Sequence, residues 1–281
     1  MEKNKPKTKP ARIIAFLIML IGGAAMILPF IWMISTSLKE ANNVYQIPPQ
    51  WIPDPIDWRN FVDIWTKTEL LNGIKNTILV SVCVVVFGTF SSTMAAFAFA
   101  KLEFPFKKAL FICILSTMMI PFVVLLVPQY IIYAKINWLN TLLPLIIPGA
   151  LGNVSMIFFL RQYMTGLPTS LLEAAKIDGC GYFKIYYRIF LPLCKPAIVG
   201  QVIMIFMATW NDYFGPMVFI NDSRKRTIQV VIAMLNSYHE TQTDIPLIMA
   251  GSLIAILPVL ILFIFCQKYF TNSFAMSGLK D

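Results

Sequence analysis

The feature that most constrains the fold of this chain is a set of six long apolar runs that are almost free of charge. A helix that crosses a hydrocarbon core of about 30 Å needs about 20 consecutive apolar residues. Six runs meet this requirement, and Asp212 is the only Asp, Glu, Lys or Arg in any of them. The runs are residues 13–36, 77–100, 109–128, 141–160, 197–219 and 245–266. The sequence therefore predicts an all-α integral membrane protein with six transmembrane helices, forming one transmembrane domain at 13–266.

The basic residues between the runs predict the orientation of the chain in the bilayer. With both termini in the cytoplasm, 15 of the 23 Lys and Arg residues fall in 71 cytoplasmic residues and 8 fall in 77 outer residues. Short cytoplasmic segments are enriched in Lys and Arg. The cytoplasmic segments are then the basic tail 1–12, the loops 101–108 and 161–196, and the C-terminal tail 267–281. We expect a multi-pass protein of the cell membrane.

The overall composition agrees with this class of protein. Only 13% of the residues are charged and 58% are hydrophobic, whereas about 25% charge is usual in soluble domains. The net charge of +9 borders the predicted spans, so it does not indicate nucleic-acid binding. The first run is longer than the core of a cleaved signal peptide, and we expect it to remain as the first span.

The polar residues in the fifth run suggest a path for a solute. Trp210, Asn211 and Asp212 are consecutive, and an ionisable group inside a span is costly unless it faces a cavity or a partner. One interpretation is that Trp210 offers a flat face and its neighbours offer hydrogen bonds to a hydroxyl-rich solute. The other is that the helix ends near Trp210 and Asp212 is simply solvated. Asn153, which interrupts the fourth run, is a further candidate for the path.

The longest cytoplasmic loop, 161–196, has the pattern of two short helices. Ser170 is placed to cap a helix, with Glu173 as its capping-box partner three residues later. That helix would run to about Asp178 and end at Gly179, because a left-handed turn is easiest for glycine. A second helix is predicted over 182–190, and Leu191-Pro192 and Pro196 then break the chain before the fifth run begins. From spacing alone, the loop either docks on a partner or only rests on lipid headgroups.

A resemblance to a known family bears on that choice. Glu173-Ala174-Ala175-x-x-Asp178-Gly179, with Leu191-Pro192 downstream, resembles the signature loop of permease subunits of bacterial and archaeal ATP-binding-cassette (ABC) importers. Other segments resemble the sugar-permease branch related to the maltose importer: Leu28–Trp32, Ser37–Lys39, Asn60-Phe61, Trp138–Thr141, Trp210–Asp212 and Arg226–Gln229. The chain departs from the pattern at Cys180 and at its ending, Met276–Leu279.

The resemblance implies a type I ABC importer permease fold and a transport function. The loop would be a coupling helix that docks on a cytoplasmic ATPase, with Glu173 paired to a basic residue there and Gly179 setting the turn between the loop helices. The implied assembly holds two ATPase subunits, a second and different permease chain, and an extracellular solute-binding protein. The outer loop 37–76, with Trp51, Trp58 and Trp65, either contacts that binding protein or only covers the span ends.

The chain carries no signature of an enzyme. It lacks the G-x-x-x-x-G-K-[ST] phosphate loop, its single histidine is His239, and no paired acids or metal-like cysteine spacing occur. ATP and magnesium would therefore belong to the partner ATPase, and we expect no cofactor on this chain. Two alternatives stay open: an ion-coupled secondary transporter, and an ABC permease for a non-sugar solute such as a glycerol-phosphate compound. Which sugar would be carried does not follow from the sequence.

Overall fold

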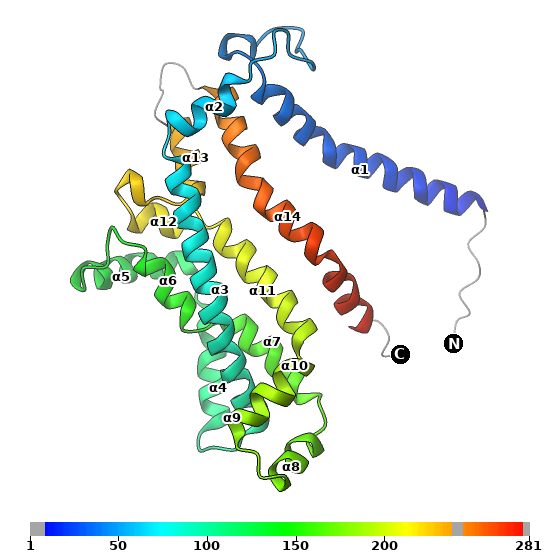
Figure 1. Ribbon diagram of the computed structural model, residues 1–281, viewed down its shortest axis with the longest axis vertical. Coiled ribbons are helices and arrows are strands. Elements are labelled where there is room, and N and C mark those ends of the chain that lie inside the picture. The colour runs from blue at the N-terminus through cyan, green and yellow to red at the C-terminus, as the bar shows by residue number, and fades with distance from the viewer. Residues whose placement is uncertain (1–8, 238–243, 278–281) are drawn as a thin grey trace. The chain divides into compact units, whose positions relative to one another are not determined.

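The computed structural model describes residues 9–237 and 244–277, with side chains for 13–236 and 244–267, and in this part of the chain every regular element is helical (Figure 1). Residues outside it include His239 and most of the predicted basic tail. The α-helices are α1 (Lys9–Ser37), α2 (Arg59–Thr66), α3 (Leu70–Lys101), α4 (Lys107–Ser116), α5 (Phe122–Lys135), α6 (Leu143–Ala150), α7 (Val154–Thr165), α8 (Ser170–Ile177), α9 (Tyr182–Ile185), α10 (Leu191–Leu193), α11 (Lys195–Trp210), α12 (Phe214–Phe219), α13 (Ile228–Ser237) and α14 (Ile245–Ser277). Short 3-10 turns lie at η1 (Ala41–Asn43), η2 (Thr117–Met119) and η4 (Ser223–Lys225), and a π-helical turn lies at η3 (Tyr186–Phe190).

The described helices account for up to six membrane spans. Four are long and apolar enough to cross a bilayer by themselves: Ile13–Ser37, Leu70–Lys101, Leu143–Thr165 and Ile245–Gln267. Two further spans result if each of two bent helix pairs is counted as one: Lys107–Met119 with Phe122–Lys135, bent by 100°, and Tyr182–Leu193 with Lys195–Trp210, bent by 81°. The predicted all-α, multi-span fold is confirmed.

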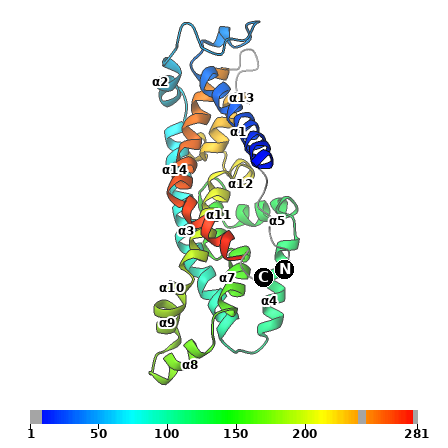
Figure 2. The same cartoon turned by 90° about the vertical axis from the view of Figure 1, so that its right-hand side faces the viewer.

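Two of the apolar runs differ from straight spans. In the third run, Pro121 takes an extended conformation at the start of α5, and Figure 2 shows α5 turned away from the direction of α4. Proline supplies no backbone donor, which weakens the helix at this point and favours a break there. In the fifth run, α11 ends at Trp210 and α12 starts at Phe214. The second interpretation of Asp212 placed the end of the helix near Trp210, and α11 does end there.

The chain divides into two compact units, 1–68 with 232–254 and 69–231 with 255–281. In the first unit, Asn60 on α2 donates its side-chain amide to the carbonyls of Ser37 (3.0 Å) and Lys39 (2.9 Å), which ties α2 to the end of α1. Lys39 Nζ lies 4.3 Å from the centre of the Trp32 ring. Burial lowers the pKa of the Lys39 ammonium, because removal from water disfavours its charged form.

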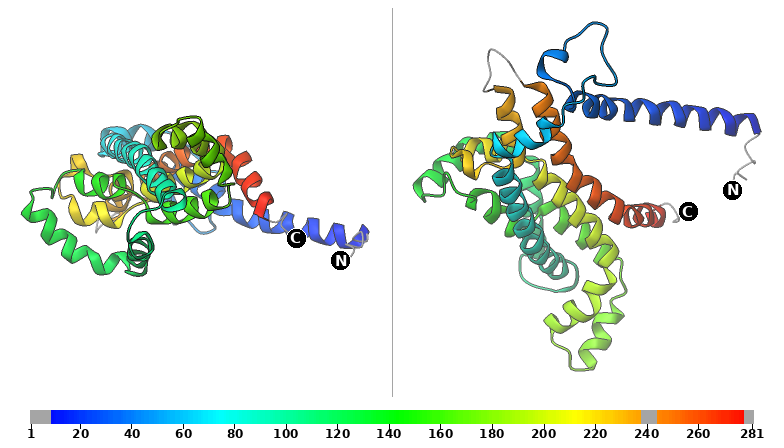
Figure 3. Two further views of the ribbon diagram at one scale, coloured as in Figure 1. Left: turned by 90° about the horizontal axis from the view of Figure 1, so that it is seen from below. Right: turned by 45° about the horizontal axis from the view of Figure 1, so that its top comes forward.

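The second unit is organised around α3, which packs against α6, α7 and α11. Glycines allow the closest of these approaches: a Cβ on Gly88 of α3 would lie 2.6 Å from the carbonyl oxygen of Gly149 on α6. Ser91 Oγ donates to the Ala150 carbonyl at 2.7 Å. The small residues of α3 therefore serve close helix packing. The right-hand view of Figure 3 shows α8 beyond the C-terminal end of α3.

Candidate functional site

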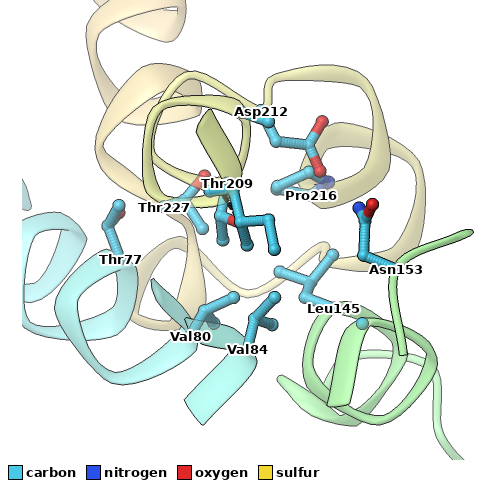
Figure 4. Close-up of a pocket in the computed structure, with 12 residues that line it drawn as sticks. Thr77, Val80, Val84, Leu145, Asn153, Thr209, Asp212, Pro216 and Thr227 are labelled. Atoms are coloured by element: carbon cyan, nitrogen blue, oxygen red, sulfur yellow. Dashed lines mark hydrogen bonds between the residues drawn. The ribbon is translucent and has the colours of Figure 1, made fainter. Parts of the chain in front are cut away.

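A pocket of about 280 Å³ opens in the second unit, between α3, α6 and the broken fifth run (Figure 4). Asp212 is the only charged side chain among the described residues that line it. Its other polar groups belong to three threonines, Thr77, Thr209 and Thr227, and to Asn153. The remaining lining residues are small or apolar: Val80, Val84, Leu145, Gly149, Ile205, Ala208 and Pro216.

Asp212 occupies the gap between α11 and α12. Its Oδ1 accepts the backbone N–H of Gly215 at 3.3 Å, so the carboxylate satisfies one of the free donors at the start of α12. The side chain is half-buried and also lines the pocket. Figure 4 shows its carboxylate near Pro216, on the same side of the pocket as Asn153. The Asp212 carboxylate therefore accepts a hydrogen bond at the start of α12 and is also the charged group of the pocket.

Asn153, in the fourth run, likewise caps a helix and lines the pocket. Its Oδ1 accepts the N–H of Met156 at 2.9 Å and caps α7, while its own N–H donates to Ser92 Oγ at 2.8 Å. Gly152, in the left-handed region at φ +138°, completes the break between α6 and α7. The interruption predicted at Asn153 is confirmed, and it places a polar side chain in the pocket wall.

Trp210 and Asn211 do not line this pocket. The Trp210 side chain is only 1% exposed; its Nε1 donates to the Ala255 carbonyl at 3.0 Å, and its ring stacks on Phe206. Trp210 therefore joins α11 to α14. Asn211 is exposed, and its amide donates to the Met207 carbonyl at 2.9 Å.

The three threonines of the pocket were missed in the sequence. Thr77 is held by two contacts: its hydroxyl donates to the Gly73 carbonyl at 2.7 Å and accepts the N–H of Ile228 at 2.9 Å. Thr227 directly precedes Ile228, and Thr209 is separated from Asp212 by two residues. The available signal was a hydroxyl at the edge of an apolar run, which is too common in membrane helices to mark a site.

The loop helix α8 ends as the glycine predicts. Gly179 is in the left-handed region at φ +74°. Its N–H donates to the Lys176 carbonyl at 3.0 Å, and the N–H of Cys180 donates to the Ala175 carbonyl at 2.9 Å. This pair of bonds is the Schellman motif, which satisfies the last carbonyls of a helix. A Cβ on Gly179 would meet nothing within 4 Å, so glycine is required by the backbone conformation and not by space.

The capping box predicted at the start of α8 is wrong. Thr169 is the residue before the helix, Ser170 is already helical, and no side chain caps the helix. Thr169 has helical backbone angles, φ −70° and ψ −25°, whereas a side-chain cap requires an extended residue at this position. Glu173 is exposed, and its side chain does not act as a capping partner at the start of α8. Ala174 and Asp178 are also exposed, while Ala175 packs inward.

The chain breaks before the fifth run, between Pro192 and Pro196 as predicted, but the second loop helix is longer than the predicted range 182–190. The second loop helix passes through η3 and α10 to Leu193, and the 81° bend follows at Cys194. Proline is tolerated in the first turn of a helix, where no backbone donor is needed, and Pro192 holds this place in α10. Pro192 is exposed, while Leu191 is half-buried against the core of the second unit.

Comparison with known proteins places this geometry in a family. The chain is 31% identical over 98% of its length to the melibiose/raffinose/stachyose import permease protein MelC of Bacillus subtilis, of which it covers 98%. It is 32% identical over 81% of its length to the arabinooligosaccharides transport system permease protein AraQ of Halalkalibacterium halodurans, of which it covers 81%.

Solved structures show the same fold. One is the crystal structure of a bacterial ABC transporter involved in the import of the acidic polysaccharide alginate; it matches 95% of this chain and 100% of its own, with a TM-score of 0.81 and 22% identity. Another, the alginate transporter in complex with an alginate pentasaccharide-bound periplasmic protein, matches 90% of this chain and 93% of its own at a TM-score of 0.62 and 17% identity. The model of one family, the binding-protein-dependent transport system inner membrane component, matches residues 88–275. With two thirds of its length matched by that model, this chain belongs to the family of binding-protein-dependent transport system inner membrane components.

Proposed function

We propose that this chain is a transmembrane subunit of an ATP-driven importer and forms part of the translocation path for a sugar or oligosaccharide. The observation that carries the proposal is the loop helix α8, which presents Glu173 and Ala174 to solvent and ends in a rigid Schellman turn at Gly179. Family membership supports import, and the sugars printed in the names of MelC and AraQ support the substrate class.

The proposed mechanism couples α8 to a separate ATPase. Glu173 pairs with a basic residue of the ATPase, and the small side chain of Ala174 lets the helix enter a cleft there. Ala175 is buried on the opposite side and packs into the same core as Tyr186 and Phe190. A displacement of α8 by the ATPase therefore reaches the helices of the second unit through packed side chains. Such a device switches between discrete packings that the partner biases.

The rest of the assembly follows from this role. Two ATPase subunits, each using ATP and magnesium, supply the chemistry, and a second, different permease chain completes the path through the bilayer. Both termini lie in the cytoplasm, on the side of α8. An extracellular solute-binding protein delivers the solute, in keeping with the periplasmic protein in the related alginate complex. Trp51, Trp58 and Trp65 are exposed and form its proposed contact surface.

The test is co-purification with the ATPase. Glu173→Gln should weaken retention of the ATPase by the membrane subunits and lower solute uptake, because the charged contact is lost while the fold is kept. Glu103→Gln is the matched control, since Glu103 is exposed and paired within its own chain to Lys107 at 3.1 Å. Full retention and full uptake with Glu173→Gln would contradict the docking role.

A further inference from the structure

The charge distribution around the pocket is one-sided. Asp212 contributes a carboxylate, and no Lys or Arg occurs among the described lining residues. The nearest basic run in the sequence is Arg224, Lys225 and Arg226, just before the lining residue Thr227. None of these three residues lines the pocket. Lys225 Nζ donates to the Asn140 carbonyl at 3.1 Å and lies 3.9 Å from Asp222.

Arg226 is likewise engaged outside the pocket. Its Nη2 donates to the Asn221 carbonyl at 3.2 Å, and its own carbonyl accepts the side-chain amide of Asn76 at 3.0 Å. The Arg224 carbonyl accepts the same amide at 2.9 Å. This segment is thus fastened to the start of α3. Among the described residues that line the pocket, Asp212 is therefore the only charged one.

We infer that this pocket selects uncharged, hydroxyl-rich solutes and excludes solutes that carry a carboxylate or a phosphate, with Asp212 as the residue that imposes the exclusion. The inference rests on the proposed function, since it assigns a substrate class to the same path. It decides between two alternatives that the sequence left open, a sugar and a glycerol-phosphate compound, in favour of the uncharged sugar.

The physical basis is the different response of a hydroxyl and an anion to a partly dehydrated carboxylate. A solute hydroxyl donates a charge-assisted hydrogen bond to Asp212, about twice as strong as a neutral one, and finds further partners in three threonines and Asn153. An anion meets repulsion that low-dielectric walls strengthen and focus. The volume of about 280 Å³ is near the lower limit for small-molecule pockets, which suits one sugar ring at a time.

The experiment measures the sign of the pocket's field without needing the natural solute. Ala208 lines the pocket and is exposed, so Ala208→Cys places a thiol there in the complete transporter. The rate of its modification is compared, by mass spectrometry of the peptide, for three methanethiosulfonates of similar size: trimethylammonium-ethyl, hydroxyethyl and sulfonatoethyl. We expect the cationic and neutral reagents to react faster than the anionic one. Asp212→Asn should lower the cation-to-anion rate ratio about tenfold, as expected for loss of one nearby charge.

Three controls isolate the effect of Asp212. Asp212→Glu keeps the charge and should keep the ratio. Asp222→Asn removes an acid outside the pocket and should leave the rate ratio at position 208 unchanged. Thr165→Cys reports on a distant exposed site, where the ratio should not change with Asp212→Asn. Asn at position 212 retains the acceptor for Gly215, so the fold of α12 is preserved.

Several outcomes overturn the inference. These are equal rates for the three reagents, a ratio that survives Asp212→Asn, or no reaction at position 208 with or without ATP. None of them touches the proposed function, which depends on uptake driven by the ATPase. Conversely, loss of ATPase retention with an intact rate ratio would contradict the proposed function alone.

Discussion

The hydroxyl oxygens of Thr93 and Tyr186 lie 2.8 Å apart, and both side chains are buried. Thr93 Oγ1 also lies 2.7 Å from the Thr89 carbonyl, to which it donates, so the proton between the two hydroxyls comes from Tyr186. The bond joins α3, whose N-terminal half lines the pocket, to the π-helical turn that follows the loop helix. It is a direct polar link between the candidate coupling loop and the helix that contacts the candidate path.

Tyr186→Phe should loosen this link without removing the ring from the core. The ring packs against Phe97, with 5.6 Å between centroids, and Phe keeps that contact. Loss of one buried hydrogen bond costs about 1 kcal/mol of stability. We expect the complex to assemble and hydrolyse ATP but to move less solute per ATP, measured in proteoliposomes. Tyr187→Phe, on a neighbouring exposed ring, should leave that ratio unchanged; an equal effect of both substitutions would remove Tyr186 from the coupling route.

Gly179→Val should distort the end of α8. Gly179 has φ +74° with open space around it, so the penalty is backbone strain of about 1–2 kcal/mol and not a clash. We expect weaker retention of the ATPase on the membrane subunits, while the melting temperature of the transmembrane part stays within a few degrees. Gly179→Asn is the matched control, because asparagine accepts the left-handed region more readily. Equal retention of the ATPase by Gly179→Val and Gly179→Asn would show that docking does not depend on the left-handed conformation at this position.

The turn at Gly179 could be predicted because it depends on a few adjacent residues. Glycine follows a helical stretch, and the left-handed conformation is local to it. The capping box failed although it is also a local pattern, because Thr169 adopts helical angles and Ser170 is already inside the helix, where it cannot act as its cap. The second loop helix likewise runs past its predicted end at Phe190, to Leu193, because proline is compatible with a first helical turn and Pro192 lies in the first turn of α10.

The pocket could be predicted only in part, because its walls come from distant parts of the sequence. Asp212 and Asn153 were recognisable as polar residues inside apolar runs. The burial of Trp210 depends on Ala255, far along the chain, and no pattern around position 210 encodes that neighbour. Thr77 accepts the N–H of Ile228, 151 residues away in the sequence, and Thr227 directly precedes Ile228. Tertiary packing decides which polar groups face the pocket.

Asn60→Ala should destabilise the first unit. The Asn60 amide serves two carbonyls, those of Ser37 and Lys39, and its removal leaves both without this donor. A buried acceptor without a partner costs about 1–3 kcal/mol. Thermal unfolding of the detergent-purified protein should show a lower melting temperature. Asn43→Ala is the control, since Asn43 accepts only an exposed amide from Gln46 at 2.8 Å; an equal shift in both variants would contradict the anchoring role of Asn60.

Gly88→Ala should force α3 and α6 apart. The added Cβ would lie 2.6 Å from the Gly149 carbonyl oxygen, which belongs to a backbone and cannot turn away as a side chain would. Overpacking of this kind costs about 1–3 kcal/mol. Because Gly149 and Val84 line the pocket, solute uptake should fall together with the melting temperature, while retention of the ATPase on α8 is unaffected. Gly200→Ala on α11 is the control: a Cβ there meets nothing within 4 Å in this chain, and alanine is the better helix former. A lower melting temperature with Gly200→Ala but not with Gly88→Ala would show that the close approach of α3 and α6 does not limit the fold.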